Sequence, residues 1–322
     1  MSAFPDGLVI AGQFSDFDAL ADATAGWDLT YSQVGGGAFS GAVEIACTAS
    51  LQIIRETWSA PLLVEGTQPR DAVSIALVPA APAGVRWLGT EYDPGRTLIG
   101  GLPGHEVHFV GLGPVEVVAV SIGRERFEQH VRARFAEDGV KLARDLNLRA
   151  MPGAASCAER AHAMDAFRGV LRSGAARRPV ARDSLEEAIL QVLLDGLDLD
   201  TAARPVPLTV RWRIARKAEE VLRARLDDPP SLTELCQLTR AGERTLHAAL
   251  RDGYGMPPLR HLRNLRLNAA RRRLRRREGS VTEIAADLGF FHFARFSEEY
   301  RSLFHQLPSE TLRRARLEAA TG

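Results

Sequence analysis

The feature that most constrains this chain is a helix-start signal that occurs twice in its C-terminal third. Residues 231–234 read Ser-Leu-Thr-Glu, and residues 280–283, 49 positions later, read Ser-Val-Thr-Glu. In such a capping box the serine hydroxyl accepts a hydrogen bond from an amide of the first turn, and the glutamate reaches back to the serine amide. Each box is followed by a short helix, a tight turn and a second helix. A unit of about twenty residues with this order is a helix-turn-helix motif, so we predict motifs at 231–251 and 280–301.

A long helix is expected between the two motifs, at residues 258–277. Its apolar stripe is formed by Leu262, Leu265, Ala269 and Leu274. Twenty residues that rise about 1.5 Å each give a length of about 30 Å. Adjacent major grooves on one face of DNA are roughly 34 Å apart. This helix is therefore expected to hold two reading helices one turn of DNA apart, with its arginines facing outward.

Several further segments carry a resemblance to a known family. They are 255–263 (Gly-Met-Pro-Pro-Leu-Arg-His-Leu-Arg), 265–270 (Leu-Arg-Leu-Asn-Ala-Ala), 284–290 (Ile-Ala-Ala-Asp-Leu-Gly-Phe), 296–301 (Phe-Ser-Glu-Glu-Tyr-Arg) and 308–310 (Pro-Ser-Glu). With these residues at these spacings, residues 208–318 resemble the DNA-binding domain of the AraC/XylS family of bacterial regulators. The resemblance implies an all-α domain with two helix-turn-helix motifs and double-stranded DNA as its partner.

The chain departs from the family pattern at three positions. Arg240 occupies the first turn where the family usually has glycine, Gly242 replaces a capping serine, and His305 follows the second motif where glycine is common. The departures at the first turn leave open whether Arg240 weakens the first motif.

The candidate DNA contacts combine the helical geometry with the resemblance. On the exposed faces of the two reading helices, Arg244 is suited to guanine, Thr245 to a thymine methyl group and Glu298 to cytosine N4. Helix N-termini such as those at the two capping serines bind phosphate. For Arg266 a structural ion pair is the alternative reading. The full set of predicted DNA contacts is Ser231, Arg244, Thr245, His247, Arg251, Arg266, Ser280, His292, Phe293, Arg295, Glu298 and Arg301.

The rest of the chain has a different character. Residues 1 to about 120 contain short apolar runs separated by Gly and Pro, which favours an antiparallel sandwich or barrel. From about residue 124 the pattern is helical, with a second helix at 155–172, a loop at 173–183 and a leucine-dense helix from 184 to about 198. We therefore divide the chain into a first domain (1–200), a linker (201–207) and the DNA-binding domain (208–318), an α+β multidomain fold.

Charge follows the same division. The net charge is only +1, yet 24 of the 41 basic residues and 14 of the 40 acidic residues lie in residues 204–322. A basic half joined to an acidic half suggests a nucleic-acid-binding domain attached to a domain with another role. The arginine cluster at 271–273 and 275–277 is interpreted as a solvated face that raises non-specific DNA affinity.

The first domain weakly resembles the cupin-like sensor domains of this family, which implies a role in sensing a small molecule. Its candidate ligand contacts are Trp27, Tyr31, Trp58 and Trp87, with a place in the buried core as the alternative for each. His105 and His108, with Glu44 or His130, lack the usual spacing of a cupin metal site. No catalytic or phosphate-binding motif occurs. We expect no metal, no cofactor and no enzymatic activity.

These observations predict a sequence-specific transcription regulator whose DNA binding is modulated by a small molecule. Family habit favours an activator, which would contact RNA polymerase, and residues 1–200 are expected to form a homodimer. The alternatives are control by a protein partner or by abundance, a cupin-type metalloenzyme fused to a DNA-binding domain, and a non-specific architectural DNA binder.

The compartment is expected to be the cytoplasm. Three scattered cysteines form neither a disulfide framework nor a metal pair, the first residues lack a basic signal-peptide region, and no run of eighteen apolar residues suggests a membrane span.

Overall fold

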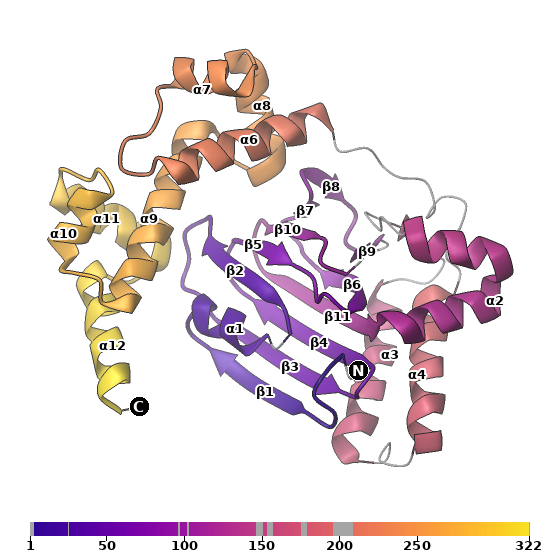
Figure 1. The fold of residues 1–322 in the computed structure, drawn as a ribbon. Coiled ribbons are helices and arrows are strands. Elements are labelled where there is room, and N and C mark those ends of the chain that lie inside the picture. The colour runs from indigo at the N-terminus through magenta and orange to yellow at the C-terminus, as the bar shows by residue number, and fades with distance from the viewer. Residues whose placement is uncertain are drawn as a thin grey trace.

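The computed structural model contains a β-rich N-terminal part and a helical C-terminal part (Figure 1). The structure describes residues 3–24, 26–95, 97–101, 103–145, 151–152, 157–174, 179–195 and 209–321. The expected linker at 201–207 lies outside the described residues. Within them, no helix is long and apolar enough to cross a membrane.

The N-terminal part is built on two antiparallel sheets, as the short strands and turns predicted. The larger sheet has the order β1 (Val9–Phe14), β3 (Gly41–Cys47), β4 (Leu51–Trp58), β11 (Val115–Gly123), β6 (Ala72–Ala80), β9 (Thr97–Gly101) and β12 (Met151–Pro152). The smaller sheet has the order β2 (Asp28–Gln33), β5 (Leu62–Thr67), β10 (Glu106–Gly111), β7 (Val85–Trp87) and β8 (Thr90–Tyr92). A short helix, α1 (Phe17–Ala23), follows β1, and Asp16 caps it by accepting hydrogen bonds from the amides of Asp18 and Ala19.

Side chains alternate between the two faces of each strand, so each sheet contributes to two cores. On β4, Ile54 and Trp58 belong to the core between the sheets, whereas Leu51 and Ile53 belong to a second core on the outer face of the larger sheet. Three helices cover that outer face (Figure 1): α2 (Arg124–Asp145), α3 (Cys157–Ser173) and α4 (Pro179–Leu194).

Helix α4 begins earlier than the sequence indicated. We expected a loop to residue 183, but the helix starts at Pro179. Proline at the first helical position costs nothing, because its missing N–H would be unpaired there anyway. Ser184, interpreted as part of a helix start, lies inside the helix and its hydroxyl donates to the carbonyl of Val180 at 2.9 Å. Such a bond to the preceding turn allows serine in a helix interior.

The C-terminal part is all helical and lies on the opposite side of the sandwich from α3 and α4 (Figure 1). Its helices are α6 (Val210–Ala224), α7 (Leu232–Thr239), α8 (Glu243–Tyr254), α9 (Pro258–Arg276), α10 (Val281–Asp287), α11 (Phe293–Phe304) and α12 (Pro308–Thr321). Helices α7 and α8 form one helix-turn-helix unit and α10 and α11 form the other. Helix α9 joins them, as the sequence predicted.

Only the second capping box is complete. At Ser280 the hydroxyl accepts from the amide of Glu283, and the Glu283 carboxylate accepts from the amide of Ser280. At Ser231 the hydroxyl accepts from the Glu234 amide in the same way. The Glu234 carboxylate, however, binds the guanidinium of Arg225 at 2.6 Å, so the reciprocal half of the first box is replaced by an ion pair.

Candidate DNA-binding surface and effector cavity

The first reading helix, α8, is held in place by its apolar face. Leu246 and Leu250 are fully buried against the other helices of this unit. Arg244, Thr245 and Arg251 are exposed, and His247 is half-buried. The exposed side chains lie on one helix and are available to a groove, which is the arrangement expected of a recognition helix.

The left-handed position in the turn before α8 is occupied by Arg240 and not by glycine. Arg240 adopts the left-handed conformation, with φ of 53° and ψ of 39°. Its amide donates to the carbonyl of Gln237 and that of Ala241 to Cys236, at 3.1 and 3.0 Å, so the carbonyls at the end of α7 are paired. The turn is therefore ordered, but a residue with a side chain pays steric strain of about 1–2 kcal/mol in this conformation.

Relief of that strain is testable. Arg240→Gly is expected to raise the free energy of unfolding by about 0.5–1 kcal/mol, because the strain removed exceeds the backbone entropy that glycine loses on folding. Urea denaturation of the full chain measures the change. The control is Arg240→Ala, which keeps the strain and should give no gain; equal stabilisation by both variants would contradict the explanation.

The second reading helix, α11, has a buried apolar face and an exposed face, as α8 does. Phe296 and Tyr300 are buried, while His292, Phe293, Arg295, Glu298 and Arg301 are exposed. Arg295 donates to Glu299 one turn later at 2.9 Å and remains 65% exposed, so its guanidinium is still accessible. Phe291 is also highly exposed at the start of this helix. It was not among the predicted contacts, although two adjacent phenylalanines at a turn are a signal that one of them faces solvent.

Arg266 has partners inside the domain. Its Nε donates to the carbonyl of Leu226 at 2.6 Å, and its guanidinium lies 6.0 Å from the ring centre of Phe290. These contacts tie α9 to the end of α6 and to the turn of the second motif. Arg266 thus has a structural role, as the alternative to DNA contact proposed, but it binds backbone carbonyls and not the carboxylate of an ion pair.

The arginine cluster of α9 is only partly a solvated face, because Arg276 is exposed whereas Arg271 and Arg275 bind carboxylates of the N-terminal part. Arg271 is almost fully buried and binds the carboxylates of Asp16, the cap of α1, and of Asp18 in its first turn, while its guanidinium lies 4.1 Å from the ring centre of Phe17. Arg275 binds the same two carboxylates. Burial would raise the pKa of Asp16, but the two guanidinium charges hold it below its usual value. Only carboxylates from the distant N-terminal part make burial of Arg271 possible.

Amide side chains reinforce this junction between the two parts of the chain. Asn268 donates to the carbonyl of Gln33 at 2.8 Å and accepts from its amide at 3.0 Å. Asn264 donates to the carbonyl of Val34 at 2.8 Å, and the Gln33 side chain donates to the carbonyl of Leu303 at 2.7 Å. All of these groups are buried, so their pairing fixes α9 against the end of β2.

A cavity of about 80 Å³ lies between the two sheets of the N-terminal part. All four aromatic residues proposed as ligand contacts, Trp27, Tyr31, Trp58 and Trp87, line it. Three of them are buried and Trp27 is half-buried. A place in the core and a place on the cavity wall are therefore compatible for these aromatic residues, because the cavity lies within the core between the two sheets.

The cavity contains one acidic group that the sequence did not single out. Glu56 accepts hydrogen bonds from the hydroxyl of Tyr31 at 2.8 and 3.0 Å and from that of Thr24 at 3.4 Å. Burial raises the pKa of Glu56 to about 7 and that of Tyr31 well above its ordinary value. The sequence signal for this group was a glutamate at a strand position whose neighbours on the same face, Ile54 and Trp58, are apolar.

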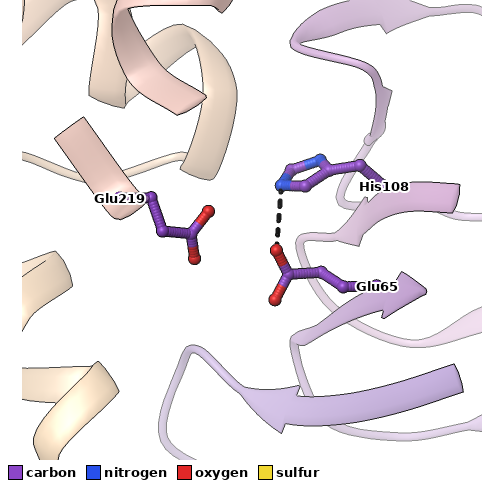
Figure 2. A group of neighbouring side chains, drawn as sticks. All are labelled: Glu65, His108 and Glu219. Carbon is purple, nitrogen blue, oxygen red and sulfur yellow. Dashed lines mark ion pairs between the residues drawn. The ribbon is translucent and has the colours of Figure 1, made fainter. Parts of the chain in front are cut away.

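A second cluster of ionisable groups lies at the junction between the two parts (Figure 2). Glu65 comes from β5, His108 from β10 and Glu219 from α6. The Nε2 atom of His108 lies 3.8 Å from Glu65, and the hydroxyl of Tyr254 donates to Glu219. Burial lowers the pKa of His108 to about 3, so its ring is neutral, and burial also raises the pKa of Glu65 to about 7.

These three residues are also the one possible metal-binding group found among the described residues, with ligand atoms within 4.8 Å of one another. The group does not include the combination of His105 with Glu44 or His130 that the sequence raised. Both carboxylates already have cationic partners: Arg223 binds Glu65 and Glu219, and Arg216 lies 3.6 and 3.4 Å from the same two groups. We therefore assign the cluster to pairing α6 with the smaller sheet.

Two helix-turn-helix units on one connecting helix, packed on a β-sandwich with an internal cavity, define a class of two-part proteins with a double helix-turn-helix. Comparison with known proteins agrees with this class. Residues 235–314 match the family model described as a helix-turn-helix domain.

Among curated relatives, "XylDLEGF operon transcriptional activator 1" of Pseudomonas putida is 39% identical over 108 residues, which are 33% of this chain and 31% of the relative. "Probable thc operon regulatory protein" of Rhodococcus erythropolis is 29% identical over 210 residues, which are 62% of each chain. The chain therefore aligns with less than two thirds of either relative.

Among solved structures, a "probable AraC family transcriptional regulator" from Rhodopseudomonas palustris is 31% identical and is matched over 32% of this chain and 96% of its own, with a TM-score of 0.30. The C-terminal part of this chain is thus similar in sequence to regulators of the AraC/XylS type.

Proposed function

We propose that this chain is a transcription regulator that binds double-stranded DNA through both helix-turn-helix motifs and is controlled by a small molecule in the N-terminal cavity. One observation carries the proposal. The smaller sheet is at once a wall of the cavity and the surface on which the DNA-binding domain packs.

Strands β2 and β5 show this double role residue by residue. On β2, Tyr31 lines the cavity, while the hydroxyl of Ser32 accepts a hydrogen bond from Arg272 of α9 at 3.3 Å. On β5, Val64 lines the cavity, while Glu65 pairs with α6. Successive side chains of a strand point to opposite faces, so neighbouring positions contact the cavity and the DNA-binding domain.

Strands β10 and β7 repeat the pattern. Val107 and Phe109 line the cavity, and between them the ring of His108 packs 4.4 Å from Trp212 of α6, centre to centre. Trp87 lines the cavity, and its neighbour Arg86 donates to the carbonyls of Arg251 and Asp252 near the end of the first reading helix. A ligand that shifts these strands therefore changes contacts that hold the DNA-binding domain.

The sign of regulation and the assembly are part of the proposal. The curated relatives named above include an operon activator, which favours activation through contact with RNA polymerase. We propose that residues 1–200 also hold a dimer, which would place two double helix-turn-helix domains on one operator. We also propose that the chain acts as a regulator and not as an enzyme, in keeping with its helix-turn-helix match.

Selection of bound sequences from random duplex DNA tests the DNA-binding part. We expect two short preferred blocks about ten base pairs apart, because α9, at 19 residues, spans about 28 Å. Binding with a steep salt dependence but no enriched sequence would instead indicate a non-specific architectural protein.

Arg295→Ala is expected to relax sequence preference at one base-pair position and to weaken binding to the selected operator by about 1–3 kcal/mol. The guanidinium is exposed on α11 and can form paired hydrogen bonds with a guanine. Affinity is measured on the operator and on its single-base variants. The control is Arg313→Ala, on α12 and outside the two motifs; an equal loss on every sequence would make Arg295 a phosphate contact.

A further inference from the structure

The chemistry of the cavity wall restricts what the cavity can hold. The wall is almost entirely apolar, and besides the four proposed contacts it includes the ring of Phe109. Such a wall takes up a compact aromatic or hydrocarbon body through burial of apolar surface.

In the described part of the chain, the wall carries one carboxyl group and no basic side chain. Glu56 is the only carboxylate among the described residues that line the cavity, and none of those residues is arginine, lysine or histidine. The hydrogen bonds from Tyr31 and Thr24 leave Glu56 without a cationic partner. A ligand carboxylate would therefore enter next to a buried acid with no cation to compensate it, which is costly in an apolar surrounding.

Three other polar atoms on the wall form no hydrogen bond with the described residues. Within the described part of the chain, Nε1 of Trp58, Nε1 of Trp87 and Oε1 of Gln68 form no hydrogen bond. Two acceptors, Glu56 and Gln68, thus face a ligand, and the indole groups can donate to a ligand oxygen. A buried polar group without a partner costs about 1–3 kcal/mol, so a ligand that satisfies these atoms gains affinity.

We propose that the cavity binds a small aromatic molecule with a hydrogen-bond-donating amine or hydroxyl group, which contacts Glu56, and that it discriminates against carboxylates. The inference rests on the proposed function, because it names the ligand class of the same cavity. The donor adds a further hydrogen bond to Glu56, which has no cationic partner on the wall, and the aromatic body lies between the tryptophan rings.

The test uses the full chain and three probes with the same ring: 2-phenylethylamine, 2-phenylethanol and phenylacetate. Binding is followed at pH 8 by tryptophan fluorescence and by calorimetry, without DNA. We expect the amine or the alcohol to bind at least tenfold more tightly than phenylacetate. Tighter or equal binding of phenylacetate, or saturation by none of the three at millimolar concentration, would overturn the proposal.

A variant distinguishes the two donors. Glu56→Gln removes the negative charge but keeps an acceptor oxygen, so it should weaken binding of the amine at least tenfold and binding of the alcohol less. The matched control is Glu44→Gln, which removes a carboxylate from the outer face of the same sheet, where it pairs with Arg168. Equal effects of the two variants on the amine would contradict a role for Glu56.

Operator binding is then measured with the probe that binds. A change in operator affinity supports both the ligand class and the proposed function. Binding of the probe with no change in operator affinity would contradict control by this cavity while leaving the ligand class in place.

Discussion

Arg271→Met is expected to lower the free energy of unfolding by about 3 kcal/mol. The guanidinium of Arg271 is buried between Asp16, Asp18 and the ring of Phe17. Removal of one partner from a buried ion pair is strongly destabilising, because it leaves charge without compensation in an apolar surrounding. Arg275 still neutralises part of the charge of the two carboxylates. The expected loss therefore lies at the lower end of the range of about 3–5 kcal/mol for breaking a buried ion pair. Urea denaturation of the full chain at pH 7.5 measures it.

Two further variants make this result specific. Arg276→Met, one helical position beyond Arg275 but largely exposed, should change the free energy by less than about 0.5 kcal/mol. Combining Arg271→Met with Asp16→Asn and Asp18→Asn should recover much of the loss, since no buried charge is then left unpaired. A loss below 1 kcal/mol for Arg271→Met alone would show that this junction is open to water.

Gly66→Ala is expected to have a larger effect, a loss of more than about 4 kcal/mol or failure to fold. Gly66 lies in β5 opposite Leu29 of β2, with φ of 147°, and an added Cβ would lie 1.8 Å from the carbonyl oxygen of Asp28. The clash is with the backbone of the paired strand, so no side-chain movement relieves it. Soluble yield and thermal unfolding followed by circular dichroism measure the effect.

The matched control is Gly104→Ala. Gly104 also has a positive φ, of 70°, but no atom lies within 4 Å of an added Cβ. This variant carries only the left-handed strain of about 1–2 kcal/mol. If the two variants were equally stable, the close pairing of β2 with β5 at Gly66 would be disproved.

The C-terminal domain was largely predictable because its signals are local. Helix α7 begins directly after Ser231, as the first capping box predicts, and α9 ends one residue before the predicted 277. Capping residues, turn residues and apolar spacing all lie within a few positions of the features they determine. The first capping box is incomplete because the Glu234 carboxylate binds Arg225, and the four-residue pattern does not reveal this ion pair.

The junction and the cavity were less accessible from the sequence because they depend on distant residues. The contact between Arg271 and Asp16 joins positions 255 residues apart, and a run of arginines by itself predicts a solvated surface. The cavity aromatics were proposed individually from residue type. Their convergence around Glu56 follows from the pairing of two sheets, which strand periodicity alone does not specify.

The alternation of side chains in the smaller sheet has a consequence for how such a protein changes during evolution. Along β2, β5, β7 and β10, a substitution at one position alters the ligand cavity, and a substitution at the next alters the contact with the DNA-binding domain. Under the proposed function, mutants with a new inducer preference and mutants that no longer need an inducer should therefore map to the same short strands, at alternating positions. A single codon step along β10, from Val107 to His108, would separate the two phenotypes.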